Sequence, residues 1–231
     1  MTSIYGIDPG FTGAAARIAP DSALSYDPLP VKKFTTKIGR KTKTESQMDM
    51  QKFVSWASYM DPTKSFVFLE LPDSAGGQNK SSGIKLLKGL GQMEGILTAF
   101  GVPWAWIKPK DWQQLIWGLD DYVKVPQEST RKGKVITKLV TDTKATSVAC
   151  ARRLWSDHDF LYGVTEKRSG PARTKPGRWG FMDAALIAAA GKKIARHSGA
   201  LEYWQEFAGP NATRPYPGRS KSHIEFLNTI R

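Results

Sequence analysis

The stretch Ser65-Phe66-Val67-Phe68-Leu69-Glu70 is an almost unbroken apolar run that ends in a carboxylate. A strand buried on one face alternates between apolar and polar side chains, whereas a strand without this alternation is buried on both faces. Such a strand needs a helical layer on each side, which constrains the chain to an α/β architecture. A second apolar strand, residues 2–8, runs into Asp8-Pro9-Gly10, a string typical of a tight turn.

The remaining pattern predicts a mixed five-stranded sheet with helices on both faces, in which an antiparallel hairpin comes first and later strands follow helical crossovers. We expect strands at 2–8, 12–19, 24–38, 65–70 and 103–107, and helices at 46–60, 81–100, 109–117, 136–155 and 181–196. We expect a mobile basic loop at 32–43, a polar and basic stretch at 118–135 and an irregular insert at about 157–178. Residues 1–196 are predicted to form one domain. The sequence does not indicate where the basic, aromatic extension 197–231 packs.

Charge narrows the choice of partner. The chain of 231 residues carries a formal net charge of +13, far more than solubility requires, so a polyanion such as nucleic acid is the expected partner. A generic basic or ribosome-associated protein is the alternative that charge alone leaves open. Cys150 is the only cysteine and the three histidines are scattered, which excludes a disulfide framework and a cysteine or histidine metal cluster. No apolar run reaches 18 residues and the N-terminus lacks a signal-peptide layout, so we expect a bacterial or phage-infected cytoplasm and no membrane partner.

Three acids stand at informative places. Asp8 ends the first strand, Glu70 ends the fourth, and Asp183 precedes the small-residue run 184–190. Taken alone, Asp8 is consistent with a turn that it caps itself, and Asp183 with a helix cap. Three acids in this order in a basic protein favour instead a shared site for Mg²⁺, which prefers oxygen ligands.

The order of these acids resembles the ribonuclease H-like superfamily and, within it, the RuvC family of Holliday junction resolvases, in particular its phage and organellar branch. The similar segments are Ile7-Asp8-Pro9-Gly10, Phe68-Leu69-Glu70, the glycine-spaced segment 91–97, Ile107-Lys108-Pro109-Lys110-Asp111-Trp112-Gln113, and Asp183-Ala184-Ala185-Leu186-Ile187-Ala188. The resemblance covers roughly residues 2–196. Lys144 stands where the family carries a helper lysine.

The resemblance implies a ribonuclease H-like nuclease domain that resolves four-way DNA junctions by paired phosphodiester hydrolysis. It implies Asp8, Glu70 and Asp183 as ligands of Mg²⁺ or Mn²⁺, with two ions per site, and Lys144 as a fourth catalytic group. It also implies a homodimer, for which the helix at 81–100 offers an apolar face with Ile84, Leu87, Gly91, Gly95 and Ile96.

One departure from the family pattern concerns a further acid three or four residues before the last aspartate. Gly180 and Trp179 occupy those positions. Acids that could substitute in space are Asp73, Asp157, Asp159 and Glu166.

Basic side chains around such a site are expected to follow DNA backbones, because lysine and arginine contact phosphates. The candidates are Lys32, Lys33, Arg40, Lys41, Lys80, Lys85, Arg131, Lys132, Lys134, Arg152, Arg153, Lys167, Arg168, Arg173, Lys175 and Arg178. The insert is the densest region, with five cations and no acid in 167–178. A solvated linker is the alternative for that segment.

Three other functions remain open. The string Asp8-Pro9-Gly10-Phe11-Thr12-Gly13 partly fits actin-like and sugar-kinase ATPases, but those enzymes have two similar lobes, and this chain shows no internal repeat. A non-catalytic binder of branched DNA is consistent with the missing fourth acid. A related nuclease acting on flaps or replication forks is the third.

Overall fold

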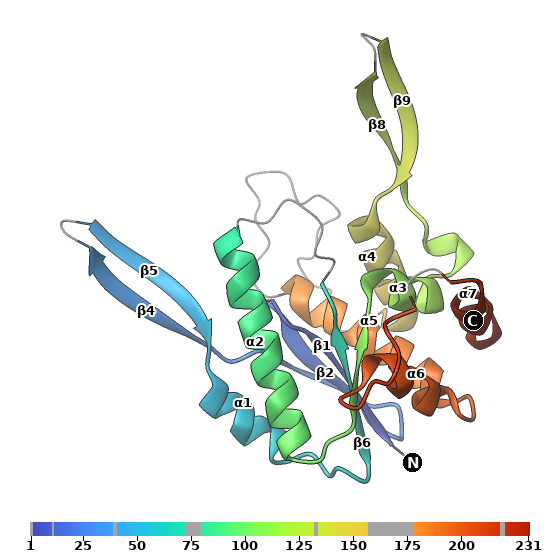
Figure 1. Ribbon diagram of the computed structural model, residues 1–231. Coiled ribbons are helices and arrows are strands. Elements are labelled where there is room, and N and C mark those ends of the chain that lie inside the picture. The colour runs from blue at the N-terminus through green and yellow to red at the C-terminus, as the bar shows by residue number, and fades with distance from the viewer. Residues whose placement is uncertain are drawn as a thin grey trace.

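The computed structural model describes residues 2–10, 12–38, 41–72, 80–131, 134–156, 178–217 and 220–231. Its centre is a five-stranded sheet in the order β3-β2-β1-β6-β7 (Figure 1). The strands are β1 (Ser3–Asp8), β2 (Ala14–Ile18), β3 (Leu24–Pro28), β6 (Ser65–Glu70) and β7 (Trp104–Ile107). β1, β2 and β3 pair antiparallel, whereas β1, β6 and β7 run parallel. The mixed five-stranded sheet with helices on both faces is as predicted.

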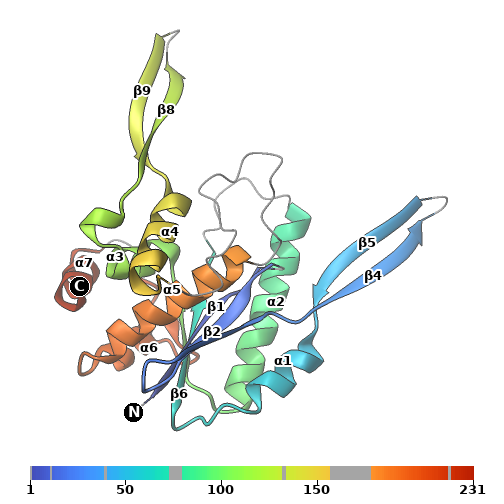
Figure 2. The same cartoon turned by 180° about the vertical axis from the view of Figure 1, so that it is seen from behind.

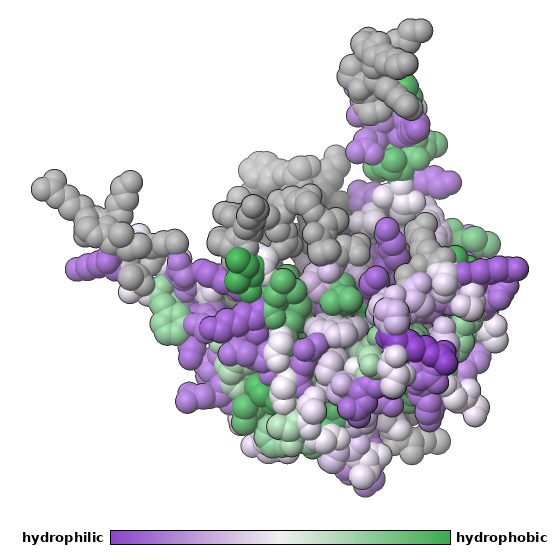
Figure 3. Space-filling model, viewed as in Figure 1, coloured by the Kyte–Doolittle hydropathy of each residue, from purple (hydrophilic) through white to green (hydrophobic). Residues whose placement is uncertain are grey.

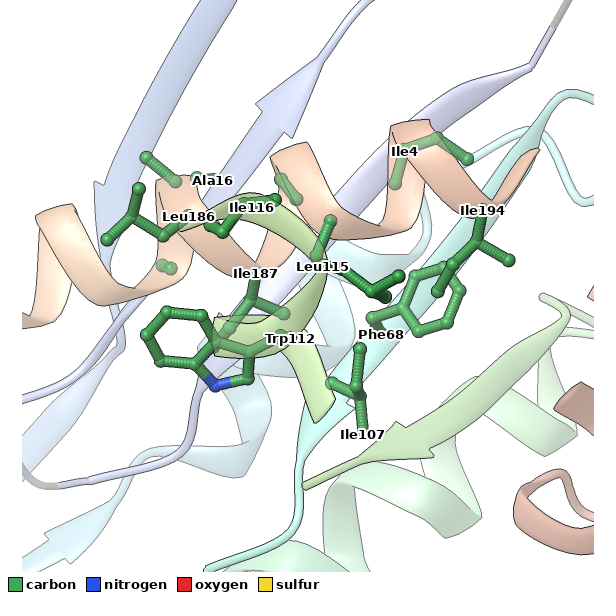
Figure 4. Packing of buried hydrophobic residues seen from close by; sticks show 14 of the residues in the cluster. Ile4, Ala16, Phe68, Ile107, Trp112, Leu115, Ile116, Leu186, Ile187 and Ile194 are labelled. Atoms are coloured by element: carbon green, nitrogen blue, oxygen red, sulfur yellow. The ribbon is translucent and has the colours of Figure 1, made fainter. Parts of the chain in front are cut away.

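Helices cover both faces of the sheet and bury one hydrophobic cluster on each. The helices are α1 (Met50–Ala57), α2 (Lys80–Ala99), α3 (Pro109–Ile116), α4 (Thr143–Leu154), α5 (Arg178–Ala195), α6 (Ala200–Ala208) and α7 (Lys221–Ile230), with a 3₁₀ turn η1 (Leu119–Asp121). α1 and α2 pack on the face that contains Ile7, Val67 and Leu69. The other helices pack on the face that contains Ile4 and Phe68 (Figure 4). No described helix has the length and apolar character to cross a membrane.

The contact between α5 and β1 is close because small residues meet there. A Cβ atom at Gly6 would lie 2.4 Å from both the Ala184 carbonyl oxygen and the Ala188 backbone nitrogen. The alanine-rich face of α5, which is fully buried from Ala184 to Ala188, therefore lies directly on the β1 backbone. This spacing fixes the position of α5 relative to the first strand.

Two further hairpins project from the body of the molecule (Figures 1 and 2). β4 (Val31–Ile38) pairs with β5 (Lys41–Met48), and β8 (Lys124–Arg131) pairs with β9 (Lys134–Thr141). At the base of the second hairpin the Asp142 backbone nitrogen donates to the Val123 carbonyl oxygen at 2.8 Å.

These hairpins correct several sequence predictions. The expected loop at 32–43 is a β-hairpin, the expected third strand at 24–38 divides into β3 and β4, and α1 begins at Met50 rather than at residue 46. The helix expected at 136–155 begins only at Thr143, since 134–141 is a strand. Val135, Ile136, Leu139 and Val140 imitate a helical apolar spacing, although the β-branched residues of this segment favour a strand.

The C-terminal residues, which the sequence did not place, pack on the same face as α5. The Trp204 indole nitrogen on α6 donates to the Trp106 carbonyl oxygen at 2.7 Å. Leu227 and Ile230 of α7 join the larger hydrophobic cluster. α6 and α7 therefore support β7 and α3 from outside.

Candidate active site

Asp8 and Glu70 end two neighbouring strands on the same face of the sheet. β1 and β6 are parallel, and their register pairs Ile7 with Leu69, so the next residue of each strand is one of these acids. Side chains alternate along a strand. Asp8 consequently shares a face with Ile4, and Glu70 with Phe68, which is the face that α5 covers. The two carboxylates thus lie at one edge of the sheet, beneath α5.

Asp183 comes to this edge from α5. The helix begins at Arg178 rather than at residue 181, so Asp183 is its sixth residue. This removes the interpretation of Asp183 as a helix cap. The side chain is largely buried, with the residue only 8% exposed, and its charge acts on Glu70 together with that of Asp8. The structure therefore brings the three predicted acids together.

Lys144 completes the cluster. It is the second residue of α4, a helix whose start is fixed by the Asp142 carboxylate, which accepts from the backbone nitrogens of Lys144 and Ala145 at 3.0 Å each. The Lys144 ammonium forms an ion pair with Oδ2 of Asp183 and lies 5.4 Å from the centre of the Trp179 ring. The predicted helper lysine therefore neutralises one of the three acids.

Glu70 is the most perturbed group at the site. Burial, followed by the negative charges of Asp8 and Asp183, raises the pKa of its carboxyl to about 8, against the opposing effects of Trp112 and Lys144. The Trp112 indole N–H donates to Oε1 of Glu70 at 2.9 Å. Within the described residues, the negative charge at the site thus exceeds the positive charge that Lys144 supplies.

The donor set fits a hard divalent cation. Oδ1 of Asp183 is buried and has no hydrogen-bond partner, and three carboxylates act on one another across the edge of the sheet. Carboxylate oxygens are the ligands that Mg²⁺ prefers. Within the described residues, no three acidic, histidine or cysteine side chains lie close enough together to hold a metal ion as they stand. The carboxylates would accordingly adjust when they bind an ion.

Trp112 is a residue of the site to which the sequence assigned no role. It is 2% exposed and packs among the residues between the sheet and α5 (Figure 4), yet its one polar atom holds Glu70. The residue after Lys108 is the proline that starts α3, the helix that carries Trp112. No sequence signal connects Trp112 to Glu70, since the hydrogen bond joins residues far apart in the chain.

The departure at Gly180 has a structural cause. A Cβ atom at this position would lie 2.3 Å from the Thr12 carbonyl oxygen and 2.7 Å from the Gly13 Cα. The first turn of α5 thus lies against the β1–β2 turn so closely that an acid at position 180 does not fit. Trp179, the other position in question, packs near Lys144. The alternative acids Asp73, Asp157, Asp159 and Glu166 lie outside the described residues.

The predicted DNA-binding cations are spread over several elements. Lys32 and Lys33 lie on β4, and Lys85 of α2 pairs with Glu45 of β5 at 2.6 Å. Lys41, Lys80, Arg131, Lys134 and Arg178 lie in β5, α2, β8, β9 and α5. Arg40, Lys132, Lys167, Arg168, Arg173 and Lys175 lie outside the described residues.

Two arginines at the end of α4 differ in their surroundings. Arg153 pairs with Asp121 at 2.8 Å and also donates to the Ile116 carbonyl oxygen at 2.8 Å, so it ties α4 to η1 and α3. Arg152 is exposed in the last turn of the same helix. Both arginines are exposed, but the Arg153 guanidinium is already held by Asp121 and the Ile116 carbonyl.

Comparisons with known proteins give a distant likeness in structure. No family model matches the sequence, and no curated protein matches it. Among solved structures, RuvC of Thermus thermophilus in complex with a Holliday junction substrate is 14% identical, with a TM-score of 0.40, covering 85% of this chain and 96% of that chain. A second structure of RuvC from Thermus thermophilus is 15% identical, with a TM-score of 0.40, covering 84% and 96%.

Proposed function

We propose that this protein is a metal-dependent endonuclease that resolves four-way DNA junctions by paired hydrolysis of phosphodiester bonds. The observation that supports this most is the convergence of Asp8, Glu70, Asp183 and Lys144 at one edge of the sheet, with a pKa of about 8 for Glu70. Clustered acids with perturbed pKa values are typical of functional sites. The three acids that meet here are those whose order in the sequence resembles the RuvC family.

The four residues have separable roles in this proposal. Asp8, Glu70 and Asp183 would hold Mg²⁺ or Mn²⁺, with two ions per site. Bound divalent ions activate water and stabilise the leaving oxygen in phosphodiester hydrolysis. Asp8 is oriented by the Gly10 backbone nitrogen, which donates to its Oδ1 at 3.2 Å, and Trp112 orients Glu70. Lys144 holds Asp183 and places a positive charge beside the phosphate.

Branched DNA is the proposed partner. The net charge of +13 favours a polyanion. β6 runs toward the side of the molecule from which both hairpins project, so the carboxylate edge lies between two arms (Figures 1 and 2). A substrate with several duplex arms matches this arrangement better than one straight duplex.

A homodimer would give paired cuts, because a four-way junction presents two equivalent strands related by an approximate two-fold axis. On α2, Ile84 and Leu87 are 67% and 62% exposed, and a Cβ at Gly91 or Gly95 would meet nothing within 4 Å. Ile96, which was predicted for the same face, packs instead against the cluster beneath α2. The exposed stripe of α2 is therefore the proposed dimer surface.

Incubation with a labelled four-way junction, with and without Mg²⁺, tests the proposal. We expect magnesium-dependent symmetric nicks, and a loss of cleavage by at least about 100-fold in Asp8→Asn, which keeps the shape of the side chain but removes its charge. Asp27→Asn, at an exposed position of β3, is the matched control and should cut normally.

Other outcomes separate the alternatives. Junction binding without cleavage at any divalent ion concentration would identify a non-catalytic binder. Faster cleavage of Y-shaped or flapped DNA than of junctions would identify a related nuclease. Cleavage by Asp8→Asn near the normal rate would contradict the site assignment.

A further inference from the structure

The C-terminal part of the chain holds the backbone on both sides of the strand partner of Glu70. In the register of β6 and β7, Glu70 pairs with Ile107. The carbonyl of the residue before Ile107 accepts from the Trp204 indole at 2.7 Å. The residue after it, Lys108, donates its backbone N–H to the Tyr216 hydroxyl oxygen at 3.2 Å. The backbone beside Glu70 is therefore fastened at two points by residues that come about 100 positions later in the chain.

Tyr216 bridges the first turn of α3. Its hydroxyl accepts from Lys108 and donates to Oδ2 of Asp111. Lys108 is the N-cap residue of α3, has no side-chain capping bond of its own, and is followed by the proline that starts the helix. In a capping box, the side chain three residues after the N-cap accepts directly from the N-cap N–H. Here the Tyr216 hydroxyl stands between these two groups, so it completes the cap of α3 from outside the helix.

The Tyr216 hydroxyl is held in place and keeps its proton. Its ring lies 5.1 Å from the Phe207 ring, and the Lys108 ammonium lies 4.4 Å from its centre. Burial, followed by the charge of Asp111, raises the pKa of the Tyr216 phenol. The other described side-chain contact of the Asp111 carboxylate is with His223, whose Nε2 lies 3.4 Å away without forming a hydrogen bond. The hydroxyl is thus the main partner of a carboxylate that is largely buried.

The turn that Tyr216 holds also carries the tryptophan that orients Glu70. Trp112 follows Asp111 directly, and its indole N–H donates to Oε1 of Glu70 at 2.9 Å. α3 has only eight residues, so a shift of its first turn also moves Trp112. The contacts from Tyr216 to Asp111 and from Trp112 to Glu70 therefore follow one another through two adjacent residues of one short helix.

We propose that Tyr216 is a positioning residue of the carboxylate site: it holds the first turn of α3 so that Trp112 keeps Glu70 in place. Groups that orient the ligands of a metal typically contribute about 10- to 100-fold to its affinity. Figure 3 shows mainly hydrophilic and neutral residues on the outer surface where Figure 1 places α6, so the anchoring contacts lie on the inner side of the C-terminal segment. The inference rests on the proposed function for the reaction, but the contacts that carry it do not depend on that reaction.

The deciding variant is Tyr216→Phe, which keeps the ring and removes the hydroxyl. Tyr203→Phe is the matched control, because it makes the same chemical change in the same aromatic cluster, where the Tyr203 hydroxyl lies 3.5 Å from Nδ1 of His223 on α7. Unfolding curves establish a temperature at which both variants are fully folded. All further measurements are made at that temperature, so that a loss of stability is separated from a change of position.

The first measurement is the NMR resonance of the Trp112 indole N–H in metal-free protein, which Trp112→Phe identifies by removing it. We expect Tyr216→Phe to shift this resonance and to speed its exchange with water, whereas Tyr203→Phe leaves both unchanged. The second measurement is Mn²⁺ affinity, which should be about 10-fold weaker in Tyr216→Phe and within about twofold of the parent in Tyr203→Phe. In junction cleavage at a fixed Mn²⁺ concentration, kcat should fall while KM stays the same, because Glu70 is proposed to hold metal and not DNA.

An unmoved Trp112 resonance or an unchanged Mn²⁺ affinity in Tyr216→Phe would overturn the proposal and limit Tyr216 to a role in stability. Equal changes in Tyr203→Phe would overturn it too, since the effect would then come from loosening of the whole aromatic cluster. A shifted resonance and weaker Mn²⁺ binding in a protein that cuts no DNA would support the positioning role and refute the nuclease. Normal junction cleavage by Tyr216→Phe with an unmoved resonance would refute the positioning role alone.

Discussion

The Gly6→Ala substitution tests the contact that places Asp183 over the sheet. The added Cβ would lie 2.4 Å from two backbone atoms of α5, whereas ordinary contacts begin at 3.4 Å, so β1 and α5 must separate by about 1 Å. Neither neighbour is a flexible side chain that can rotate away. Overpacking of this kind costs about 1–3 kcal/mol, and we expect the upper end of this range because backbone must move.

The assay is urea unfolding followed by circular dichroism. A loss of about 3 kcal/mol lowers the midpoint by about 1 M urea or more at the slopes usual for proteins. Gly83→Ala is the matched control: its Cβ would meet nothing within 4 Å on α2, so the same chemical change should leave stability unchanged or raise it by up to about 1 kcal/mol.

The same separation moves Asp183, which immediately precedes Ala184. A misplacement of about 1 Å can cost about 100-fold in rate, so cleavage by Gly6→Ala should fall even at temperatures where the protein is fully folded. A Gly6→Ala protein whose unfolding midpoint equals that of the parent would refute the spacing between β1 and α5 described here.

Three further predictions concern charge and assembly. In the presence of a chelator, Glu70→Gln should be more stable than the parent at pH 9 but not at pH 4. The pKa of Glu70 is near 4.5 in the unfolded chain and about 8 in the folded chain. As the pH rises between these values, the free energy of unfolding of the parent therefore falls by up to about 5 kcal/mol. Equal stabilities at pH 9 in urea unfolding would contradict the burial of that charge. Replacing the four cations of segment 167–175 with glutamine should flatten the salt dependence of junction binding by about 0.9 per lost phosphate contact, and an unchanged slope would mean that this segment is a linker. Gly91→Arg should give a monomer in sedimentation and reduce paired cutting more than single nicking, whereas a dimer in this variant would exclude the α2 stripe as the interface.

The central sheet could be predicted because buried strands are apolar runs in the sequence. β1 and β6 are buried strands whose apolar runs end in Asp8 and Glu70, and parallel strands bring such ends to one edge. The meeting of these two acids therefore follows from strand order alone. α2 and α3 were predicted within one or two residues for a similar reason, since each has an apolar stripe and α3 starts at a proline.

The projecting hairpins could not be predicted in this way. A ribbon surrounded by solvent buries neither face, so 32–43 shows no alternation of apolar and polar residues, and only its threonines favour a strand. The first turn of α5 was not predicted, because Gly180 is a poor helix former. The need for glycine at this position comes from the distant Thr12 and Gly13, which leave no space for a Cβ atom. The hydrogen bond from Trp112 to Glu70 likewise depends on the finished fold. What the sequence missed is thus mostly set by contacts between distant residues or by solvent.

The closed base of the β8–β9 hairpin has a consequence for how such a protein can diversify. Because Val123 and Asp142 are already hydrogen-bonded neighbours, everything between them can be exchanged without changing the path of the chain in the core. Asp142 also begins α4, so the helix that carries Lys144 keeps its starting point whatever the arm contains. In the nuclease proposed above, the hairpin can therefore vary by insertion, deletion or replacement while the position of Lys144 stays the same.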